Sequence, residues 1–509
     1  MRTLNSAKNL ASSLGITFIV IFLGFVTRKV FVDNIGVQYL GLNGLLTNIL
    51  GMMALLEGGF STSVVYNMYK PLAEDDRPRI IALLQLYRKV YRYIALGLFL
   101  FSLALYPFLG YFLKDGDGLE YVSVVYFIFV FNSIVGYFTA YKWSIINASQ
   151  QVYKLTGYNL AYQIAQNLIK LAILYYTKNY ILYLLVESAL LLLLNIGIVH
   201  KANQLFPYIR TKQKHIVDKD TKREIVNNMK NLFINKLGGY FMHSTDNIII
   251  SSFVSVATVG LYSNYTLLTG TVKSFVSKSL DSFSESVGNL IASENSEKVY
   301  EIFKSAFFFN FLASSLAVII LYCTLTPFID WWLGSQYLLT HATLVVILLN
   351  FYVDTMRTSA LTFKVKAGLF KQDRWTPFLQ GVINLVLSLI FVQYWGLTGV
   401  LFATLIAILS IGFWQFPHLC YKYIFHRSLW LYFQRYAVYT LTACAALTAS
   451  LGIIHLCKVD NLFLQCIING SISLAMTSSI YIAAFHRTTE FKILLEHVKC
   501  VIPTVKKSL

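Results

Sequence analysis

The sequence contains few charged residues for its length. Only 13% of its 509 residues are Asp, Glu, Lys or Arg, whereas roughly 25% is usual in soluble domains. Hydrophobic residues make up 56% of the chain, and the mean hydropathy is +0.59. This composition excludes an ordinary soluble fold and is typical of a membrane protein.

Acidic residues are scarcer than basic ones. The chain has 24 Asp and Glu against 42 Lys and Arg, which gives a net charge of +18. So basic a balance can indicate nucleic-acid binding. Here, however, the basic residues lie in short segments between apolar runs, where they orient helices against a membrane. We therefore expect no nucleic-acid partner.

Motifs for catalysis or metal binding are also missing. None of the six cysteines forms a CxxC pair, so neither a zinc site nor a redox site is expected. The sequence has no GxSxG, HExxH or Walker A motif. We therefore expect a protein without a cofactor that is not an enzyme and does not hydrolyse ATP.

Long apolar runs are abundant instead. About fourteen of them approach the roughly 20 residues that cross a bilayer as a helix. The least regular three, 39–64, 232–253 and 257–279, are rich in Gly, Ser, Asn and Thr, which is typical of helices that face a watery cavity. The predicted spans lie near 10–30, 39–64, 92–113, 120–141, 158–177, 180–199, 232–253, 257–279, 304–327, 338–361, 377–395, 397–417, 434–456 and 462–485.

The distribution of Lys and Arg predicts the orientation of these spans. Alternate loops are crowded with basic residues, above all residues 201–230, and the other set of loops is nearly empty. Crowded loops stay in the cytoplasm. With an even number of spans, both termini are then cytoplasmic. The first apolar run lacks a small-residue cleavage site and is predicted to be a spanning helix rather than a signal peptide.

The first half of the chain recurs weakly in the second half. Gly41-Leu42 resembles Gly260-Leu261, and Asn167-Leu168 resembles Asn384-Leu385, at a shared offset of about 220 residues. Six helices separate the copies, so both copies enter the membrane from the same side. The repeats are therefore predicted to be parallel, with a transport path between them. Chance similarity between apolar helices is the alternative.

These patterns predict an all-α integral membrane protein of about 14 transmembrane helices. Two parallel six-helix lobes are followed by two extra C-terminal helices. The predicted parts are an N-terminal lobe over 1–200, a basic cytoplasmic linker over 201–231, a C-terminal lobe over 232–417, the two extra helices over 418–485, and a basic cytoplasmic tail over 486–509.

One polar stripe runs deep into the predicted fifth helix. Gln163, Asn167 and Lys170 are spaced at i, i+4 and i+7, which places them on one helix face. A charge near mid-membrane costs about 3 kcal/mol, so such a residue faces a cavity or a partner. The stripe either lines a hydrated lumen, or Lys170 snorkels or pairs with Glu187 on the next helix.

Acidic and basic residues in other spans add candidates. His243 and Asp246 lie one turn apart in span 232–253 and could carry a proton or coordinate a cation, or they form a local hydrogen bond that fixes helix packing. Glu57 in the second span is a further candidate for ion coupling.

The remaining polar candidates are spread over both predicted lobes. Lys273 lies within the eighth span, and Arg28 at the outer end of the first span faces either the lumen or the headgroups. Asn43 belongs to the second span. Asn384 belongs to the eleventh span, where Gln380, Asn384 and Ser388 repeat the polar stripe of the fifth span without a lysine. The predicted lumen is thus cationic mainly in the first lobe and suits an anionic substrate.

Three stretches carry a resemblance to a known family. They are 36–46 (GVQYLGLNGLL) with the following 69–76, then 244–251 (STDNIIIS), and 367–377 (AGLFKQDRWTP). With these stretches and its helix number, the chain resembles the Wzx-type flippases of O-antigen, capsule or exopolysaccharide, in the multidrug/oligosaccharidyl-lipid/polysaccharide exporter superfamily. One departure is Glu57-Gly-Gly, where the family would have Glu-Leu-Gly.

The resemblance implies a V-shaped pair of lobes that alternates between inward- and outward-open states in the bacterial inner membrane. Its implied substrate is an oligosaccharide on undecaprenyl diphosphate. We expect membrane lipid, a glycan polymerase and a chain-length regulator as partners, and coupling to H⁺ or Na⁺ through Asp246, His243 or Glu57 is a further hypothesis. On this interpretation Lys170, Lys273 and Arg28 attract the diphosphate, and Gln163, Asn167, Asn43 and Asn384 surround the sugar.

Rival functions remain open at this point. A multidrug or cation antiporter of the same superfamily would need an acidic lumen. An integral-membrane glycan polymerase or ligase would need a sizeable outer loop, and the outer loops here are short. A scaffold without transport would leave the charges in the spans without a purpose.

Overall fold

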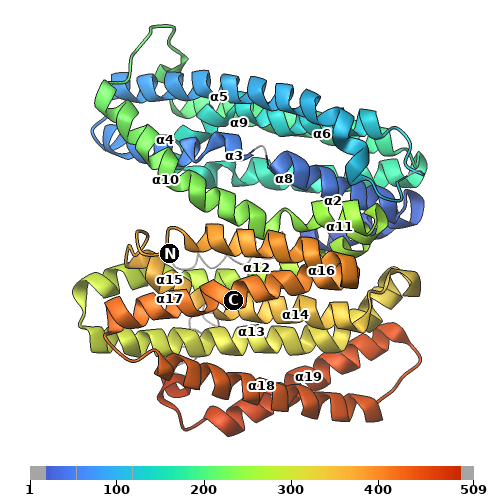
Figure 1. Cartoon of the computed structure of the whole chain (residues 1–509). Helices are drawn as coiled ribbons and strands as arrows, with labels where there is room; N and C mark the ends of the chain where they lie inside the picture. The colour runs from blue at the N-terminus through green and yellow to red at the C-terminus, as the bar shows by residue number, and fades with distance from the viewer. Residues whose placement is uncertain (1–18, 53, 117, 494–509) are drawn as a thin grey trace, which may run out of the picture. The chain divides into compact units, whose positions relative to one another are not determined.

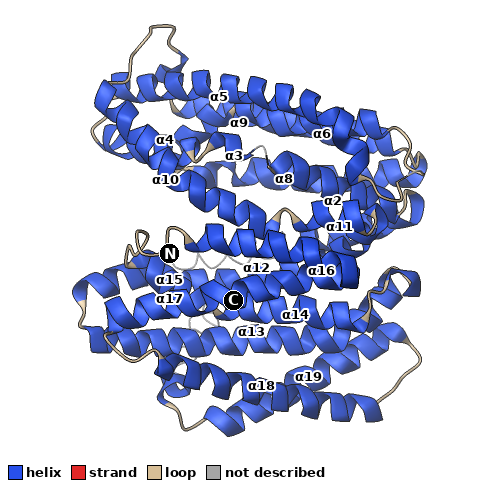
Figure 2. Ribbon diagram, in the orientation of Figure 1, coloured by secondary structure: helices blue, strands red, loops and turns tan. Residues whose placement is uncertain are grey.

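The computed structural model describes residues 19–52, 54–116 and 118–493. Within these ranges the chain is helical and contains no strand (Figures 1 and 2). The contacts between Cα atoms divide it into two compact units, one within Leu10–Gly260 and the other within Leu261–Leu509. The expected all-α fold is confirmed.

The first unit is a bundle around a core of apolar side chains from α4, α5 and α7, including Val64, Leu83 and Ile145. After a helix over residues 19–34, its elements are α2 (Val37–Gly51), α3 (Ala54–Glu57), α4 (Phe60–Ala73), α5 (Arg77–Leu105), η1 (Tyr106–Phe112), α6 (Val122–Val135), η2 (Gly136–Phe138), α7 (Ala140–Ala148), η3 (Val152–Leu155), α8 (Thr156–Tyr176), α9 (Tyr180–Leu205), η4 (Pro207–Arg210), α10 (Lys219–His243) and α11 (Asp246–Phe253).

Two of the least regular predicted spans are broken helices. The span expected over 39–64 becomes α2, α3 and α4, and Gly58 and Gly59, with positive φ angles of 59° and 84°, interrupt the helix between α3 and α4. The span expected over 232–253 is interrupted at Ser244, where α10 ends and α11 follows. Polar and glycine-rich sequence thus marks the positions where the backbone leaves the regular helix.

The contact-based division places α10 and α11 in the first unit, although the sequence repeat assigns 232–253 to the second lobe. Contacts with the start of the chain account for this: α10 packs on α4, and the Tyr240 hydroxyl donates to the carbonyl of Asn48 at 2.8 Å. The predicted linker 201–231 is largely helical, because α9 continues to Leu205 and α10 begins at Lys219. The lobe boundaries derived from the repeat stay a prediction.

The start of α10 is capped by a side chain. Asp218 accepts hydrogen bonds from the backbone N–H and the hydroxyl of Thr221, each at 2.7 Å. The hydrogen bond from the Thr221 backbone, and after it the one from the Thr221 hydroxyl, lower the pKa of Asp218 below its ordinary value. Arg79, at the start of α5, donates to Thr221 at 3.0 Å. This contact fixes the beginning of α10 against α5.

Two glycines bring helices into backbone contact within the first unit. A Cβ atom on Gly41 of α2 would lie 1.8 Å from the carbonyl oxygen of Val256, and one on Gly260 would lie 2.1 Å from the carbonyl oxygen of Val37. α12 (Val256–Ser293) begins at this crossing. Only glycine at both positions permits so close an approach.

The second unit is organised around the long helix α13, which packs extensively on α19. Stacked aromatic rings fill its core, for example Phe311 on Tyr439 with centroids 4.5 Å apart. After α12 its elements are α13 (Ser296–Trp332), η5 (Ser335–Tyr337), α14 (His341–Met356), α15 (Thr358–Lys366), α16 (Thr376–Ala407), η6 (Ile408–Gly412), α17 (Phe413–Cys420), η7 (Tyr421–Phe425), α18 (Trp430–Leu456) and α19 (Leu462–Phe485).

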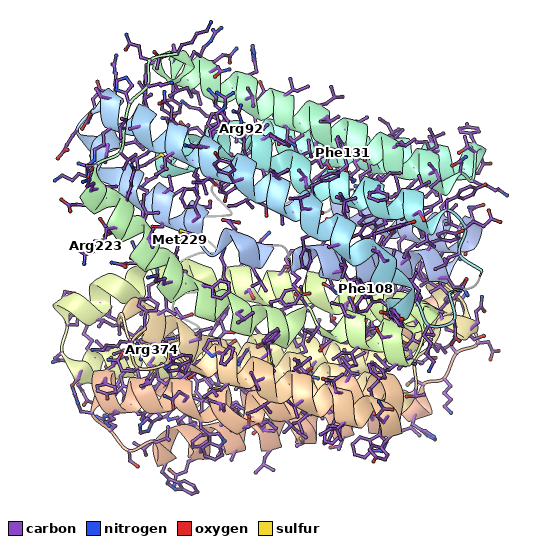
Figure 3. All side chains as sticks on the ribbon, turned by 45° about the horizontal axis from the view of Figure 1, so that its top comes forward. Arg92, Phe108, Phe131, Arg223, Met229 and Arg374 are labelled. Carbon is purple, nitrogen blue, oxygen red and sulfur yellow. The ribbon has the colours of Figure 1, made fainter. Side chains whose placement is uncertain are left out.

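Among the described residues, seven helices are long and apolar enough to cross a membrane, or eight if the bent pair of α6–η2 and α7 is one span. Thr376–Phe425 counts as one of these helices, but Gly396, with φ 52° and ψ −131°, breaks it between the two spans predicted at 377–395 and 397–417. Large apolar side chains are exposed on the first unit: Phe108 and Phe131 are 55% and 45% exposed (Figure 3). The chain is a multi-pass membrane protein.

A buried ion pair holds α15 to the segment after it. Lys364 and Asp373 form a salt bridge in which each side chain is only 6% exposed. The Lys364 ammonium also lies over the rings of Phe370 and Phe416, at 5.7 Å and 5.3 Å. Removal of either charged partner would leave the other charge buried and uncompensated.

Asp373→Asn is therefore expected to lower the free energy of unfolding by about 3–5 kcal/mol. Thermal melting of the purified variant in detergent measures the loss. The matched control is Glu294→Gln, which breaks an exposed pair with Lys298 and should change stability by less than about 1 kcal/mol. Equal melting temperatures for the two variants would contradict the assigned role of the buried pair.

Candidate functional site

Lys170, the deepest charge of the predicted stripe, forms an ion pair inside the first unit. Its Nζ lies 2.7 Å from an oxygen of Glu187, which faces α8 from α9. The same ammonium lies over the ring of Tyr183, 4.5 Å from the centroid. Gln166, one turn before Lys170, donates to the other oxygen of Glu187 at 3.0 Å. Among the alternatives that the sequence left open for Lys170, the structure shows the pairing with Glu187.

The helix over residues 19–34 adds a second cation to this group. Arg28 interacts electrostatically with the hydroxyl of Tyr183, the ring that also contacts Lys170. Phe31, one turn further, packs on Tyr183 with centroids 5.3 Å apart. Two cations and one carboxylate, Glu187, therefore surround Tyr183, so these three side chains sum to a charge of +1. We call Arg28, Lys170, Tyr183 and Glu187 the cationic cluster.

A tyrosine-rich layer continues from the cationic cluster towards α2. The hydroxyl of Tyr180 donates to the side-chain oxygen of Asn43, a residue predicted to contact sugar. Tyr39 packs on Tyr180 with centroids 4.8 Å apart. Amide and phenol groups next to aromatic rings can bond sugar hydroxyls and pack on sugar faces. Arg28, Asn43 and Lys170, chosen from distant parts of the sequence, are thus brought together.

The other two residues of the stripe are not part of the cationic cluster. Gln163 is exposed on α8. The side chain of Asn167 donates to the carbonyl of Gln163 at 2.8 Å, within its own helix. The face of α8 that meets Glu187 carries Gln166 and Lys170 instead. A sugar-binding role for Gln163 and Asn167 stays a prediction.

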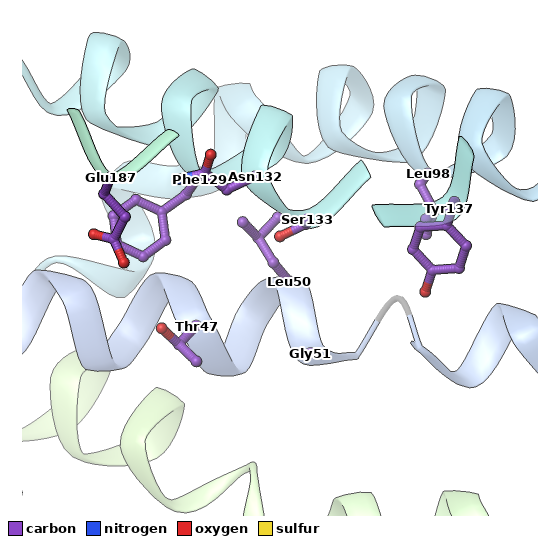
Figure 4. Close-up of a pocket in the computed structure, with 9 residues that line it drawn as sticks. All are labelled: Thr47, Leu50, Gly51, Leu98, Phe129, Asn132, Ser133, Tyr137 and Glu187. Carbon is purple, nitrogen blue, oxygen red and sulfur yellow. The ribbon is translucent and has the colours of Figure 1, made fainter. Parts of the chain in front are cut away.

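A cavity of about 360 Å³ lies beside Glu187 (Figure 4). Its walls come from α2, α5, α6, η2 and α9, all in the first unit. Five of its nine lining residues carry side-chain oxygens, and only Glu187 among them is charged. The lining residues are Thr47, Leu50, Gly51, Leu98, Phe129, Asn132, Ser133, Tyr137 and Glu187.

Glu57, predicted for ion coupling, lies at the break between α3 and α4. It accepts from the backbone N–H of Ser61 at 3.3 Å, and Lys236 of α10 is 3.9 Å from its carboxylate. Tyr91 interacts electrostatically with it. Glu57 is thus held within the first unit by several partners.

The other two residues predicted for coupling lie at the second break. Asp246 is the first residue of α11 and is buried, in a position where a helix favours a negative charge. His243 is the last residue of α10, and its side chain lies outside the described ones. The proposed contact between them therefore stays a prediction.

In the second unit, Lys273 is joined to a charged group on α14. It pairs with Asp354, which also binds Arg357 three residues later, with Nε–Oδ1 at 2.9 Å. The pairing of Lys273 with Asp354 was not predicted from the sequence. The side chain of Lys273 is 44% exposed, whereas that of Arg357 is 12% exposed. Lys273 is therefore the accessible cation of this trio.

Asn384 lies inside helix packing in the second unit. It is fully buried, and its side-chain oxygen accepts from Thr404 at 3.1 Å and from Ser388 at 3.3 Å. Gln380 of the same stripe is buried and donates to the carbonyl of Ala407. In this structure Asn384 therefore connects the two halves of α16 and does not reach solvent.

Three members of the site were not predicted from the sequence: Gln166, Tyr183 and Tyr180. A signal for two of them was present, because Tyr180, Tyr183 and Glu187 are spaced at i, i+3 and i+7 and therefore share one face of α9. A polar face on α9 opposite a lysine-bearing face on α8 predicts a contact between adjacent helices.

The chain has the fold of polytopic membrane transporters, as comparison with solved structures shows. It is similar to the lipid II flippase MurJ in an inward closed conformation, with TM-score 0.66 and 16% identity over 93% of this chain and 99% of that one. It is also similar to an inward-facing multidrug resistance MATE family transporter of the MOP superfamily, with TM-score 0.58 and 13% identity over 78% and 94%.

A third similar structure is a single-residue mutant of the MATE transporter VcmN of Vibrio cholerae, with TM-score 0.53 and 12% identity over 85% of this chain and 100% of that one. No protein-family model and no curated protein matches the sequence. At these identities the likeness establishes the fold.

Proposed function

We propose that this protein is a flippase that moves a polyprenyl-diphosphate-linked oligosaccharide across the bacterial inner membrane for surface polysaccharide synthesis. The observation that carries the proposal is the cationic cluster, a net positive charge held inside a membrane-spanning unit next to tyrosines and Asn43. The similarity to a flippase named for lipid II supports a lipid-linked substrate. Both termini are proposed to be cytoplasmic, as the Lys and Arg distribution predicts.

The sugar, the diphosphate and the polyprenyl tail of such a substrate each require a different environment during transport. Sugar hydroxyls cost several kcal/mol each if they enter hydrocarbon unpaired, so amide and phenol groups must replace water. A diphosphate is attracted by Arg28 and Lys170, and in the second unit by Lys273. The polyprenyl tail needs no protein path, because it can stay in lipid. Alternating access of the protein then exposes the head group to each side in turn.

The membrane potential assists this direction of transport. Moving one charge through 100 mV is worth about 2.3 kcal/mol, so a diphosphate of charge near −2 that leaves a negative interior gains roughly 4–5 kcal/mol. Inward movement of H⁺ or Na⁺ would add to this driving force.

The proposal is tested in the cell that carries the gene. Deletion of the gene should abolish the surface glycan and leave its lipid-linked precursor on the cytoplasmic face of the inner membrane. Expression of the wild-type chain should restore export. Normal surface glycan in the deletion strain would contradict the proposal.

A multidrug or cation exporter is the second candidate, because structures of MATE transporters share this fold. Cationic drugs need acidic groups, and Glu57, Asp246 and Glu187 are carboxylates inside the first unit. This candidate predicts that deletion raises sensitivity to cationic dyes several-fold while the surface glycan stays normal. The flippase proposal predicts the reverse pattern.

Ion coupling through Asp246 gives a further expected outcome. If the buried carboxylate of Asp246 takes up the coupling proton, transport by the wild-type chain depends on pH and Asp246→Asn flattens that dependence. Initial transport rates in proteoliposomes across a pH series measure this. A pH profile unchanged in Asp246→Asn would reject the coupling role and leave the flippase proposal standing.

A further inference from the structure

The cavity beside Glu187 is large and polar enough to hold water. At about 30 Å³ for each water molecule, its volume of about 360 Å³ accommodates roughly ten. Side-chain oxygens of Thr47, Ser133 and Tyr137 line it in addition to Glu187. Asn132 also lines the cavity, and its side-chain oxygen is buried and accepts no hydrogen bond from the described residues. A buried acceptor of this kind calls for a water molecule or a cation.

Oxygen atoms from neutral side chains and one carboxylate form a donor set for a small, hard, singly charged cation. None of the nine lining residues is basic. A negative charge beside a hydrated, oxygen-lined space therefore disfavours an anion and attracts H⁺ or Na⁺. The lining residues include none of the three that the sequence predicted for coupling, Glu57, His243 and Asp246.

Glu187 has two sides with different neighbours. On one side Lys170 and Gln166 bind its two oxygens, and on the other the cavity reaches it. Its side chain is 30% exposed, whereas that of Lys170 is 8% exposed. A cation in the cavity can therefore reach the carboxylate without passing Lys170. The ammonium of Lys170 and an incoming cation would compete for one negative charge.

We propose that this cavity is a binding site for H⁺ or Na⁺, which replaces the Lys170 ammonium on Glu187. Neutralisation of Glu187 releases Lys170 from its ion pair, and the ammonium is then available for an anion. The binding event itself does not depend on the glycan. Its use in transport, where the freed Lys170 takes the diphosphate, rests on the proposed function.

The ionisable groups that face Glu187 come from three elements. Lys170 and Tyr162 approach it from α8, Tyr180 and Tyr183 from its own helix α9, and Tyr137 lines the cavity from η2. Among these groups Lys170 is the one that carries a positive charge in contact with Glu187. Substitution of Lys170 therefore removes the internal competitor of the cation.

The test measures cation binding by the purified full chain in lipid nanodiscs, without substrate. Equilibrium dialysis with radioactive Na⁺ against a choline background reports Na⁺, and infrared titration of the carboxyl band reports protonation. The wild type should bind about one Na⁺, or show one carboxyl band that titrates, and Glu187→Gln should abolish the signal. Lys170→Met should strengthen binding of the cation by at least about tenfold, because the ion pair no longer competes.

Two further variants show whether a loss of binding comes from misfolding or from removal of the site. Lys170→Met/Glu187→Gln removes both charges, should give a monodisperse protein and should bind no cation. Asn132→Leu leaves the ion pair in place and should weaken binding at least about tenfold by removal of an oxygen and water. Ser123→Ala, which also lies on α6 but does not line the cavity, is the matched control and should bind as the wild type does.

The outcomes of these measurements distinguish Na⁺ from H⁺, and the cavity proposal from the flippase proposal. Saturable Na⁺ binding that Glu187→Gln removes identifies Na⁺, and a Glu187-dependent carboxyl band without Na⁺ binding identifies H⁺. Neither signal, or equal affinity in the wild type and Lys170→Met, would overturn the cavity proposal. Cation binding in a protein whose deletion leaves the surface glycan intact would overturn only the flippase proposal.

Discussion

Lys170→Ala is expected to abolish export of the surface glycan. The substitution removes the ammonium proposed to attract the diphosphate, and a hydrogen bond to a charged group is worth about 1.5–3 kcal/mol, or roughly ten- to hundredfold in rate. It also leaves Glu187 without its ion pair, which can destabilise the first unit by about 3–5 kcal/mol. Glycan export and the amount of protein in the membrane must therefore both be measured.

A double variant separates these two effects. Lys170→Ala/Glu187→Gln removes both charges, so no uncompensated charge stays buried and the protein level should recover. Export should remain absent, because the cationic cluster then keeps only Arg28. Lys222→Ala, an exposed lysine on α10, is the matched control and should export normally. Normal export by the double variant would show that Lys170 has no role in binding the substrate.

Gly41→Ala is expected to cause the largest loss of stability from a single methyl group. The new Cβ would lie 1.8 Å from the carbonyl oxygen of Val256, which is far inside van der Waals contact, and the opposing atom is backbone and cannot rotate away. α2 and the start of α12 would have to separate. We expect the melting temperature to fall by several degrees, or the protein to be absent from the membrane.

A glycine elsewhere in the same unit provides the control. Gly97 lies within α5, and a Cβ there would meet nothing within 4 Å. Gly97→Ala should keep or slightly raise stability, because Ala favours the helix by up to about 1 kcal/mol. Fluorescence-detected size-exclusion melting compares the two variants. If Gly41→Ala melts as Gly97→Ala does, the close crossing is not a feature of the folded protein.

The glycine crossing also shows what the sequence repeat could and could not predict. The repeat matched Gly41 with Gly260 by similarity alone. The structure shows that the two helices meet at these residues, so that each glycine faces the other helix's backbone. Sequence comparison can pair equivalent positions, but a backbone contact depends on the packing of helices far apart in the chain.

The helices themselves were largely predictable, because long apolar runs with polar ends specify them. The breaks at Gly58–Gly59 and Ser244–Thr245 were not, although polar composition marked both spans as irregular. A run of Gly, Ser and Asn fits either a cavity-facing helix or a broken one. The choice depends on backbone φ angles such as the 84° of Gly59.

The candidate site was predictable in its residue types and less so in its contacts. Lys170 stood out because a charge so deep in an apolar helix needs a partner, but lumen and ion pair fitted the same stripe. Asn384 shows the limit of the pattern: its Gln-Asn-Ser stripe matches that of α8, yet its side chain is buried against Thr404. Polar spacing identifies a polar helix face, and only packing decides what that face meets.

Reconstituted transport tests the central claim most directly. The purified chain is placed in liposomes with a fluorescent oligosaccharide on a polyprenyl diphosphate, and a membrane-impermeant quencher reports how much of the lipid has crossed. The wild type should equilibrate the lipid between leaflets within minutes, and Lys170→Ala/Glu187→Gln should do so no faster than protein-free liposomes. Equal rates for wild-type, double-variant and protein-free liposomes would contradict the claim that this protein is a flippase.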